Sequence, residues 1–177
     1  MDKILLVVID GCAPEYLTRE TAPGLYGLAD SLGFVKIVKS AVPSVTNVNH
    51  ACILSGEFPE ITQVVGNYFY NPATKEEGFV EERGVMQAPT VLQAYQRQGQ
   101  RTALLTVKGK ILGVYGQGAD LGLSAQNPDE GLLGRLDLEN PPPVGTLEST
   151  WWIYRAAVAC VERESPDLLY CTTNDYA

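Results

Sequence analysis

Four apolar runs of strand length are spaced along the chain. Residues 4–9 (ILLVVI) are a continuous β-branched and leucine run, which is the pattern of a strand buried on both faces of a parallel sheet. Residues 34–42, 102–107 and 168–172 are also rich in apolar residues. We therefore predict a strand at each of these four places.

Stretches with helical spacing of apolar residues lie between the predicted strands. This spacing predicts helices over residues 24–32, 89–98 and 146–163, and a short helix that ends near Tyr115. Proline opens the second of these helices and glycine follows it, which is the usual arrangement at the two ends of a helix.

The stretch 42–56 (VPSVTNVNHACILSG) interrupts its apolar residues with several polar ones. Ser44 and Thr46 are both helix-capping residue types and Gly56 is a good stop, so this stretch also predicts a helix. His50 lies within that helix, where a histidine more often packs and hydrogen-bonds in a core than binds a ligand. We interpret His50 as such a packing residue.

The alternation of strands and helices predicts an α/β fold, a mainly parallel sheet with helices on both faces. Residues 64–85 are rich in aromatic and turn residues, and we interpret them as strands or loops that cross the mouth of a site. Residues 127–145 contain three consecutive prolines and predict a long surface connection. A chain of 177 residues is long enough for one domain with a substantial core.

Polar side chains follow the predicted strands. Asp10 follows the first strand, Thr46 the second, Lys108 and Lys110 another, and Asp175 the last. Taken singly, each residue has an ordinary structural interpretation as a cap, a turn residue or a solvated loop residue. Because the carboxyl ends of parallel strands meet at one edge of a sheet, we expect these groups to gather there as a binding site.

An aspartate and a threonine at such an edge can share one divalent ion. The carboxylate is a hard oxygen ligand, and the Thr46 hydroxyl can act as both ligand and nucleophile. A helix that begins at Thr46 adds about half a unit of positive charge, which favours an anionic substrate. This combination indicates phosphoryl transfer, with Asp175 as the carboxylate for a second ion.

Composition narrows the classes of partner and compartment. The formal net charge is −8 and no basic stripe is present, so a nucleic-acid partner is not expected. No stretch reaches the about 18 apolar residues that a membrane span needs. The four cysteines lack CxxC spacing and lie in apolar runs, and no signal peptide is recognisable, so we expect a cytoplasmic protein. The oligomeric state cannot be read from the sequence.

Several motifs carry a resemblance to a known family. Asp10 after an apolar strand, Thr46-x-x-Asn49-His50 and the Gly-Asn pair that contains Asn67 resemble the alkaline phosphatase superfamily, most closely its nucleotide pyrophosphatase/phosphodiesterase branch. Within that branch, the stretches PSVTNVN, GNYFYNPAT and PDLLYCTTNDY and the Lys-x-Lys pair resemble the phosphonoacetate hydrolases. The resemblance extends over nearly the whole chain.

The resemblance implies a role for each matching residue. Asp10 would bind one zinc ion and Asp175 a second, and Thr46 would bridge toward the metal as the nucleophile that forms a phosphothreonine intermediate. Asn67 would donate a hydrogen bond to a phosphoryl oxygen. The two lysines that follow the third predicted strand would face the carboxylate of phosphonoacetate. The products would be acetate and phosphate.

One departure from the family pattern concerns the zinc ligands. The family has an Asp-x-x-x-His pair at the second metal, which would put a histidine at position 179, and the sequence ends at Ala177. The one histidine of the chain is His50. We therefore expect residues 1–177 to be the N-terminal part of a single catalytic domain, without the remaining ligands, that binds zinc weakly and turns over little substrate.

Two alternatives remain open from the sequence. The first is a nucleotide pyrophosphatase or phosphodiesterase that cleaves P–O bonds, against which the Lys108 and Lys110 pair argues because such substrates need no carboxylate clamp. The second is a non-catalytic remnant or interaction domain that keeps the sheet and has lost the reaction.

Overall fold

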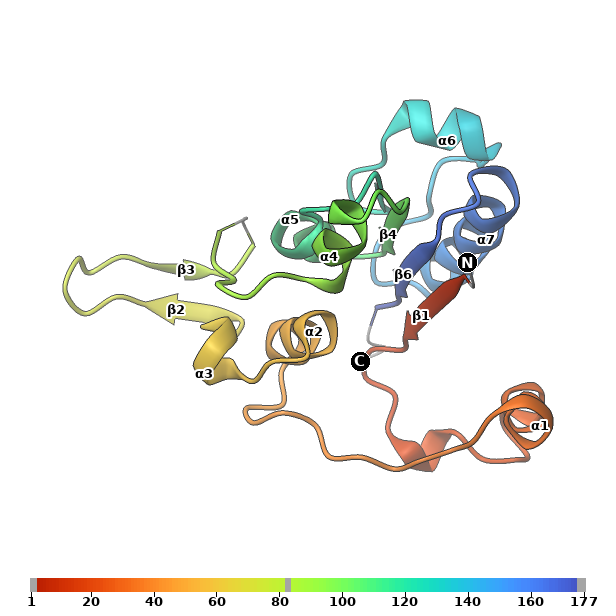
Figure 1. Ribbon diagram of the computed structural model, residues 1–177, viewed down its shortest axis with the longest axis horizontal. Coiled ribbons are helices and arrows are strands. Elements are labelled where there is room, and N and C mark those ends of the chain that lie inside the picture. The colour runs from red at the N-terminus through yellow and green to blue at the C-terminus, as the bar shows by residue number, and fades with distance from the viewer. Residues whose placement is uncertain (1–2, 82–83, 175–177) are drawn as a thin grey trace.

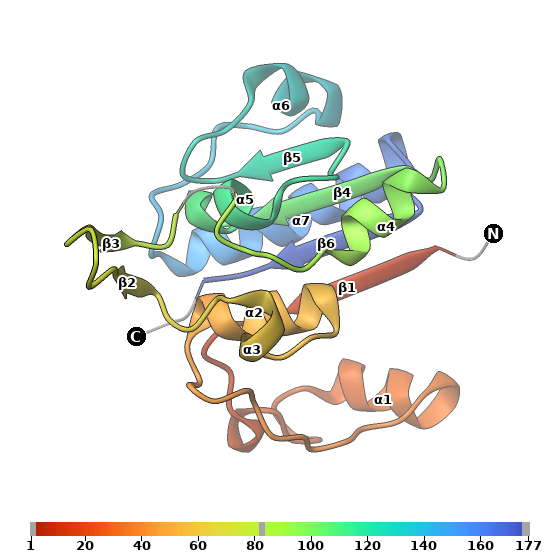
Figure 2. The same ribbon diagram turned by 60° about the vertical axis from the view of Figure 1, so that its left-hand side comes forward.

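Helices and strands alternate along most of the chain (Figures 1 and 2). The computed structural model describes residues 3–81 and 84–174. In chain order the elements are β1 (Ile4–Val8), η1 (Pro14–Tyr16), α1 (Pro23–Leu32), α2 (Thr46–Ser55), α3 (Pro59–Thr62), β2 (Tyr68–Tyr70), β3 (Glu77–Phe79), α4 (Val91–Arg97), β4 (Thr102–Thr106), α5 (Gly109–Tyr115), β5 (Leu121–Ser124), α6 (Glu130–Leu136), α7 (Leu147–Arg163) and β6 (Leu168–Thr172).

The main sheet has the strand order β1-β6-β4-β5, and all its neighbouring strands run parallel. Tyr170 of β6 is in register with Leu6 of β1 on one side and with Leu104 of β4 on the other. The strands β2 and β3 form a separate antiparallel pair within residues 64–85, where strands or loops were expected. The predicted fold class is confirmed.

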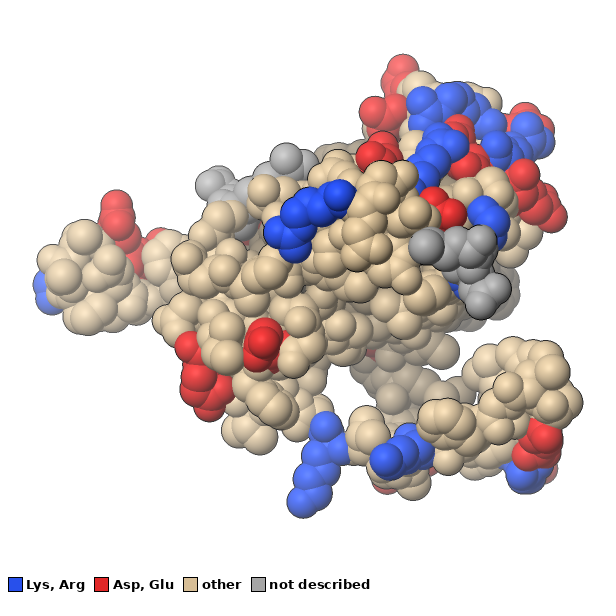
Figure 3. Space-filling model, viewed as in Figure 1, with Lys and Arg blue, Asp and Glu red and all other residues tan. Residues whose placement is uncertain are grey.

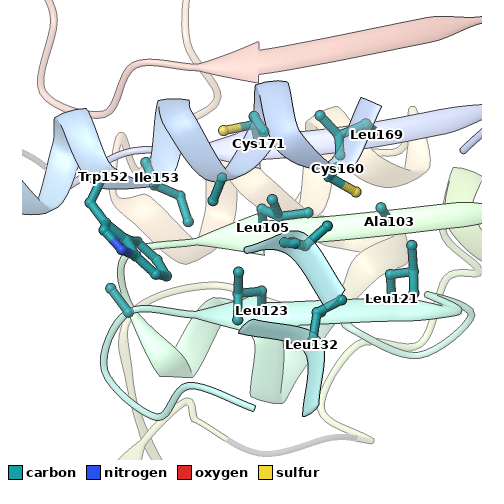
Figure 4. Packing of buried hydrophobic residues seen from close by; sticks show 14 of the residues in the cluster. Ala103, Leu105, Leu121, Leu123, Leu132, Trp152, Ile153, Cys160, Leu169 and Cys171 are labelled. Carbon is teal, nitrogen blue, oxygen red and sulfur yellow. The ribbon is translucent and has the colours of Figure 1, made fainter. Parts of the chain in front are cut away.

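One face of the sheet is covered by α6 and α7. Their apolar residues pack with alternate residues of the strands, among them Leu105 of β4, Leu123 of β5 and Leu169 of β6 (Figure 4). Trp152 and Ile153 of α7 are buried in this cluster. Figure 4 labels ten of its residues, Ala103, Leu105, Leu121, Leu123, Leu132, Trp152, Ile153, Cys160, Leu169 and Cys171.

The opposite face is covered by α2, α4 and α5. Ala51 and Leu54 of α2 and Ile111 of α5 pack against Leu104 and Tyr170, which point to this side of the sheet because strand residues alternate between faces. The helices therefore lie on both faces, as the alternating sequence pattern predicts.

Residues 127–145 were predicted to be a surface connection, and this prediction is wrong for their central part. The Asp129 Oδ1 accepts a hydrogen bond from the Leu132 N–H at 2.7 Å and caps α6. Leu132, Leu133 and Leu136 of this helix are buried. The glycines of α6 and the prolines that flank it obscure its short apolar pattern in the sequence, and the four-residue strand β5 was missed because it is short and contains a glycine.

The first strand differs from its prediction. Leu6 and Val8 of β1 pack against the cluster under α2, but Leu5 is 54% exposed and Val7 is 45% exposed. In the described ranges β1 pairs only with β6, so it is an edge strand rather than one buried on both faces. The continuous apolar run thus leaves one face of β1 uncovered.

Residues 34–42 were predicted to be a strand, and they are not one. Within the described ranges no strand lies beside them, and an extended segment without a hydrogen-bonding neighbour does not become a strand. Phe34 is 83% exposed and Val38 is 73% exposed. The arm formed by α1 and this segment is separated from the body by a hollow on the face shown in Figure 3, and no residue of α1 is buried.

Candidate active site

Asp10 is fixed at the carboxyl end of the sheet. It follows β1, and its backbone N–H donates to the Thr173 Oγ1 at 3.2 Å. The Thr173 N–H in turn donates to the Val8 carbonyl oxygen at 3.1 Å. Gly11 then adopts a φ of 70°, which lets the chain turn away directly after Asp10. The neighbouring strand ends of β1 and β6 therefore hold the Asp10 backbone in place.

Thr46 lies next to Asp10 in space. Its hydroxyl is 3.4 Å from the Asp10 Oδ2, a long hydrogen bond in which the hydroxyl is the donor. Thr46 is the first residue of α2, and the N-cap position belongs to Val45, whose side chain makes no capping hydrogen bond. The helix predicted to open at Ser44 or Thr46 and to end at Gly56 is thus confirmed, but neither residue is its N-cap, and the Thr46 hydroxyl donates to the carboxylate instead.

Asn67 performs the capping function from outside the helix. Its Oδ1 accepts the backbone N–H of Asn47, the second residue of α2, at 3.0 Å. A backbone N–H can only donate, so this contact fixes the carbonyl end of the Asn67 amide and leaves the Nδ2 as its donor end. Asn67 lines the same pocket as Thr46. The residue is therefore placed where an amide donor could meet an anion.

Asn47 and Asn49 hold the start of α2 against the rest of the fold. The Asn47 Nδ2 donates to the Val80 carbonyl oxygen at 2.9 Å, and the buried Tyr115 hydroxyl donates to the Asn47 carbonyl oxygen at 2.6 Å. The Asn49 Oδ1 accepts the Ala41 N–H at 3.1 Å. These contacts explain the unusual number of polar residues in the stretch 42–56.

His50 lies beneath the pocket and is buried. Its Nδ1 is 2.5 Å from the Tyr170 hydroxyl, and burial lowers the pKa of His50 to about 4. Burial raises the pKa of Tyr170, so the tyrosine keeps its proton. Among the described residues no other acceptor contacts the Tyr170 hydroxyl, so we assign it as the donor to Nδ1. His50 is thus a neutral, hydrogen-bonded packing residue, as its place in the sequence predicts.

Two neighbouring cavities open at this edge of the sheet. The first has a volume of about 400 Å³ and is lined by Asp10, Thr46, Asn67 and His50, among others. The second, of about 360 Å³, contains Lys108 and Lys110. The Lys108 Nζ is 3.6 Å from the Asp10 Oδ2, so this lysine joins the two cavities. The lysines follow β4, as predicted, but they line the second cavity rather than the one that holds Thr46.

The expected metal site is only partly contained in the described residues. Asp10 and Thr46 supply two oxygen atoms close together, and Asp175, the third predicted ligand, lies outside the described residues. In residues 3–81 and 84–174 no group of three or more histidine, cysteine, aspartate or glutamate side chains is placed to hold an ion. Since a catalytic zinc ion has three protein ligands, these residues alone do not complete a site.

Sequence reasoning missed several residues that build this edge. Thr173 orients Asp10, and Tyr170 and Tyr115 hold α2, yet none of the three was a candidate. Gln126 and Asn127, which line the second cavity, were also missed. A signal for Thr173 was available, because the run of polar residues after β6 marks the end of a buried strand.

Comparisons with known proteins show the family of the chain. The family model described as type I phosphodiesterase / nucleotide pyrophosphatase matches residues 4–175. An uncharacterised pyrophosphatase/phosphodiesterase of Schizosaccharomyces pombe is 32% identical over 74 residues, which are 42% of this chain and 15% of that protein. No helix within the described residues is long and apolar enough to cross a membrane.

The fold is similar to that of the phosphonoacetate hydrolase of Sinorhizobium meliloti 1021. Its complex with phosphonoacetate matches with a TM-score of 0.86 and its complex with phosphonoformate with 0.85, each at 28% identity over 99% of this chain and 46% of that one. Murine ectonucleotide pyrophosphatase/phosphodiesterase 5, as an inactive threonine-to-alanine variant with AMP, has the same fold, with a TM-score of 0.65 at 14% identity over 99% of this chain and 44% of that one. The chain thus spans less than half the length of these solved structures. It belongs to the type I phosphodiesterase / nucleotide pyrophosphatase family.

Proposed function

We propose that this chain carries the nucleophile and the carboxylate-recognition residues of a phosphonoacetate hydrolase, an enzyme that cleaves the P–C bond of phosphonoacetate. The observation that carries the proposal is the row formed by Thr46, Asp10 and Lys108, in which the Asp10 Oδ2 is 3.4 Å from the Thr46 hydroxyl and 3.6 Å from the Lys108 Nζ. The similarity to a phosphonoacetate hydrolase solved with phosphonoacetate supports the same substrate.

In the first step the Thr46 oxygen attacks phosphorus. The O–P bond forms, the P–C bond breaks, and the electron pair of the P–C bond stays with the methylene carbon. The Thr46 hydroxyl proton is released as the O–P bond forms, and the carbon takes up a proton and leaves as acetate. Charge that develops on the carbon spreads into the neighbouring carboxylate, so cations at the carboxylate stabilise the transition state more than the ground state. Lys108 and Lys110 would supply those cations.

In the second step water attacks the phosphothreonine, the O–P bond to Thr46 breaks, and phosphate leaves. The Nδ2 of Asn67 would donate to a phosphoryl oxygen in both steps. Asp10 accepts the hydrogen bond of the Thr46 hydroxyl and so orients the oxygen in the free protein. Each role uses a side chain at the same edge of the sheet.

We extend the proposal to two divalent metal ions bound at this site. The resemblance to the family implies that the ions are zinc. Asp10, Thr46 and Asp175 would be the ligands from this chain, and further ligands would come from outside the described residues. An ion, when bound, would stabilise the deprotonated Thr46 oxygen and make it a stronger nucleophile.

Ligand binding tests the proposal in the chain as it stands. Phosphonoacetate and methylphosphonate, which lacks the carboxylate, are titrated into the ¹⁵N-labelled chain and followed by NMR. We expect phosphonoacetate to bind more tightly, and Lys108→Ala or Lys110→Ala to reduce that preference by about tenfold, because a hydrogen bond to a charged group contributes about 1.5–3 kcal/mol. Equal affinity of the wild-type chain for the two ligands would contradict the proposal.

The covalent step has its own readout. In a whole catalytic domain that contains residues 1–177 and the remaining metal ligands, incubation with phosphonoacetate and zinc should put one phosphoryl group on the protein, which intact-mass spectrometry detects and peptide mapping should locate on Thr46. Thr46→Ala should abolish the adduct, whereas Thr46→Ser should retain it at a lower level because the hydroxyl remains. An adduct on another residue would show that the nucleophile is misassigned.

A second candidate function keeps the nucleophile and changes the substrate. The matching family model describes phosphodiesterases and nucleotide pyrophosphatases, which cleave P–O bonds. Comparing phosphonoacetate with p-nitrophenyl phosphodiesters separates the two candidates. If Lys108→Ala and Lys110→Ala weaken both reactions equally, the substrate assignment fails. If the chain neither binds nor transfers a phosphoryl group, the interpretation as a non-catalytic domain is favoured.

A further inference from the structure

The cavity beside the proposed nucleophile contains more than the two predicted lysines. It is lined by Glu81, Lys108, Gly109, Lys110, Gln126 and Asn127. Neither Gln126 nor Asn127 has a role in the function proposed above. Both follow β5, whereas the lysines follow the neighbouring parallel strand β4, so two adjacent strand ends meet here.

Gln126 has a defined orientation. Its Oε1 accepts the Gly109 N–H at 2.9 Å. Because a backbone N–H can only donate, this contact identifies the oxygen end of the amide, and the Nε2 is left as a donor of two hydrogen bonds. The side chain is thus fixed at one end by the residue that lies between the two lysines.

The packing around Gly109 is close. A Cβ at this position would lie 3.2 Å from the Gln126 Oε1 and 3.1 Å from the Asn127 Nδ2. Both amide side chains therefore lie directly against the backbone that carries the lysines. The Gln126 N–H also donates to the Val107 carbonyl oxygen at 3.2 Å, and the Asn127 N–H donates to the Ser124 Oγ at 3.1 Å. The first bond joins the loop after β5 to the residue that follows β4, and the second closes the turn after β5.

The charges and donors of the cavity suit an anion. Among the described residues, two lysines, two amide side chains and one acidic residue, Glu81, line it. Lys108 reaches from this cavity to Asp10, whose carboxylate is next to the Thr46 hydroxyl. Phosphonoacetate has its phosphonate and its carboxylate on one methylene carbon. A phosphonate at Thr46 would therefore place the carboxylate toward Lys108 and the cavity.

We propose that Gln126 is a specificity-determining residue, whose Nε2 donates a hydrogen bond to the substrate carboxylate while its Oε1 holds the Gly109 backbone between Lys108 and Lys110. The inference rests on the proposed function and adds a residue from a second strand end to the carboxylate site. It explains why an exposed glutamine is tied to the one glycine between the lysines.

The test uses a substitution that changes only one end of the amide. Gln126→Glu keeps an oxygen that can accept the Gly109 N–H but replaces the donor by a negatively charged oxygen. We expect its affinity for phosphonoacetate, measured by NMR titration of the full chain, to fall by about tenfold or more. The affinity for methylphosphonate should change less than about twofold because that ligand has no carboxylate. The Gly109 amide signal reports whether its hydrogen bond persists.

Two further variants complete the experiment. Gln98→Glu makes the same charge change at the exposed end of α4, before β4 begins, and should leave both affinities unchanged. Glu81→Gln removes one negative charge from the described residues that line the cavity and should strengthen phosphonoacetate binding. A similar loss for both ligands in Gln126→Glu, or no loss for either, would overturn the inference and leave the proposed function intact. A wild-type chain without preference for phosphonoacetate would overturn both.

Discussion

The burial of His50 predicts how the stability of the protein depends on pH. It is the single histidine among 177 residues, so its signals in an NMR spectrum cannot be confused with those of another histidine. The side chain is 2% exposed, and its ring centroid lies 5.8 Å from that of Tyr170 and 6.1 Å from that of Tyr115. A proton added to this ring would be charged in a poorly solvated place.

The expected magnitude follows from the pKa of His50. Burial is the largest cause that lowers this pKa from 6.5 to about 4; Asp10 raises it, and Lys108 and Lys110 lower it further. One pKa unit corresponds to about 1.4 kcal/mol, so the neutral form contributes about 3 kcal/mol to the free energy of unfolding.

This stability is lost as the pH falls, because the pKa of His50 in the folded protein is below its pKa in the unfolded chain. The unfolded chain binds a proton first as the pH falls. The contribution is therefore complete above pH 6.5 and is lost progressively as the pH falls from 6.5 toward 4.

Two measurements check this prediction. The imidazole ¹H signals, followed from pH 8 downward, should titrate with a midpoint near 4 while the protein remains folded. Urea unfolding at several pH values should show that wild-type protein loses about 3 kcal/mol more than His50→Gln between pH 6.5 and 4. Glutamine is a suitable control because it can accept the Tyr170 hydrogen bond but does not titrate.

The reasoning would be refuted by a midpoint near 6.5 in the folded protein. It would also fail if the wild type and His50→Gln lost the same free energy over that range. Either result would mean that the ring is reached by water, and that α2 is held against β6 less tightly than the contact between His50 and Tyr170 indicates.

Three more predictions concern the site and the exposed arm. Asn67→Ala should lower the free energy of unfolding by about 1 kcal/mol or more, because the Asn47 N–H loses its acceptor. Asn67→Asp should restore the stability, because the carboxylate can accept the same N–H. Urea denaturation measures both variants, and equal losses of stability would contradict the capping role. Isothermal titration with zinc should show weak binding that Asp10→Asn weakens further, whereas two ions bound at sub-micromolar affinity would show that the ligand set is misjudged. Val38→Lys should change the free energy of unfolding in urea by about 0.5 kcal/mol or less, since Val38 is 73% exposed; a larger loss would contradict the exposure of the arm.

The sequence predicts an element correctly where the elements beside it in the fold also have a clear helix or strand pattern. The predicted strands at residues 102–107 and 168–172 are β4 and β6, which lie side by side in the middle of the sheet, and their apolar residues are covered on both faces. Residues 34–42 have a similar apolar composition but no neighbouring strand in the described ranges. An apolar composition indicates that a segment can form a strand. Whether it does so depends on hydrogen bonds to a neighbouring strand.

The sequence likewise predicts some residues of the candidate site and misses others. The sequence marks Asp10 and Lys108 because each follows an apolar run of strand length, and parallel topology brings strand ends together. It cannot show that Asn67 accepts the Asn47 N–H at the start of α2, nor that Gln126 accepts the Gly109 N–H between the lysines. Those contacts join residues from separate loops, whose paths are set by packing rather than by local pattern.

The sequence by itself determined the α/β class, the strands β1, β4 and β6 and the helices α1, α2, α4, α5 and α7, and it marked Thr46 as a residue with the chemistry of a nucleophile. Only the tertiary structure decided that Thr46 meets Asp10, 36 residues earlier, and that His50 meets Tyr170, 120 residues later. Local periodicity is a property of neighbouring residues, because each turn or strand step fixes side-chain direction within a few positions. Distances, burial and the pKa of His50 depend on residues brought together across the chain, and no local pattern contains them.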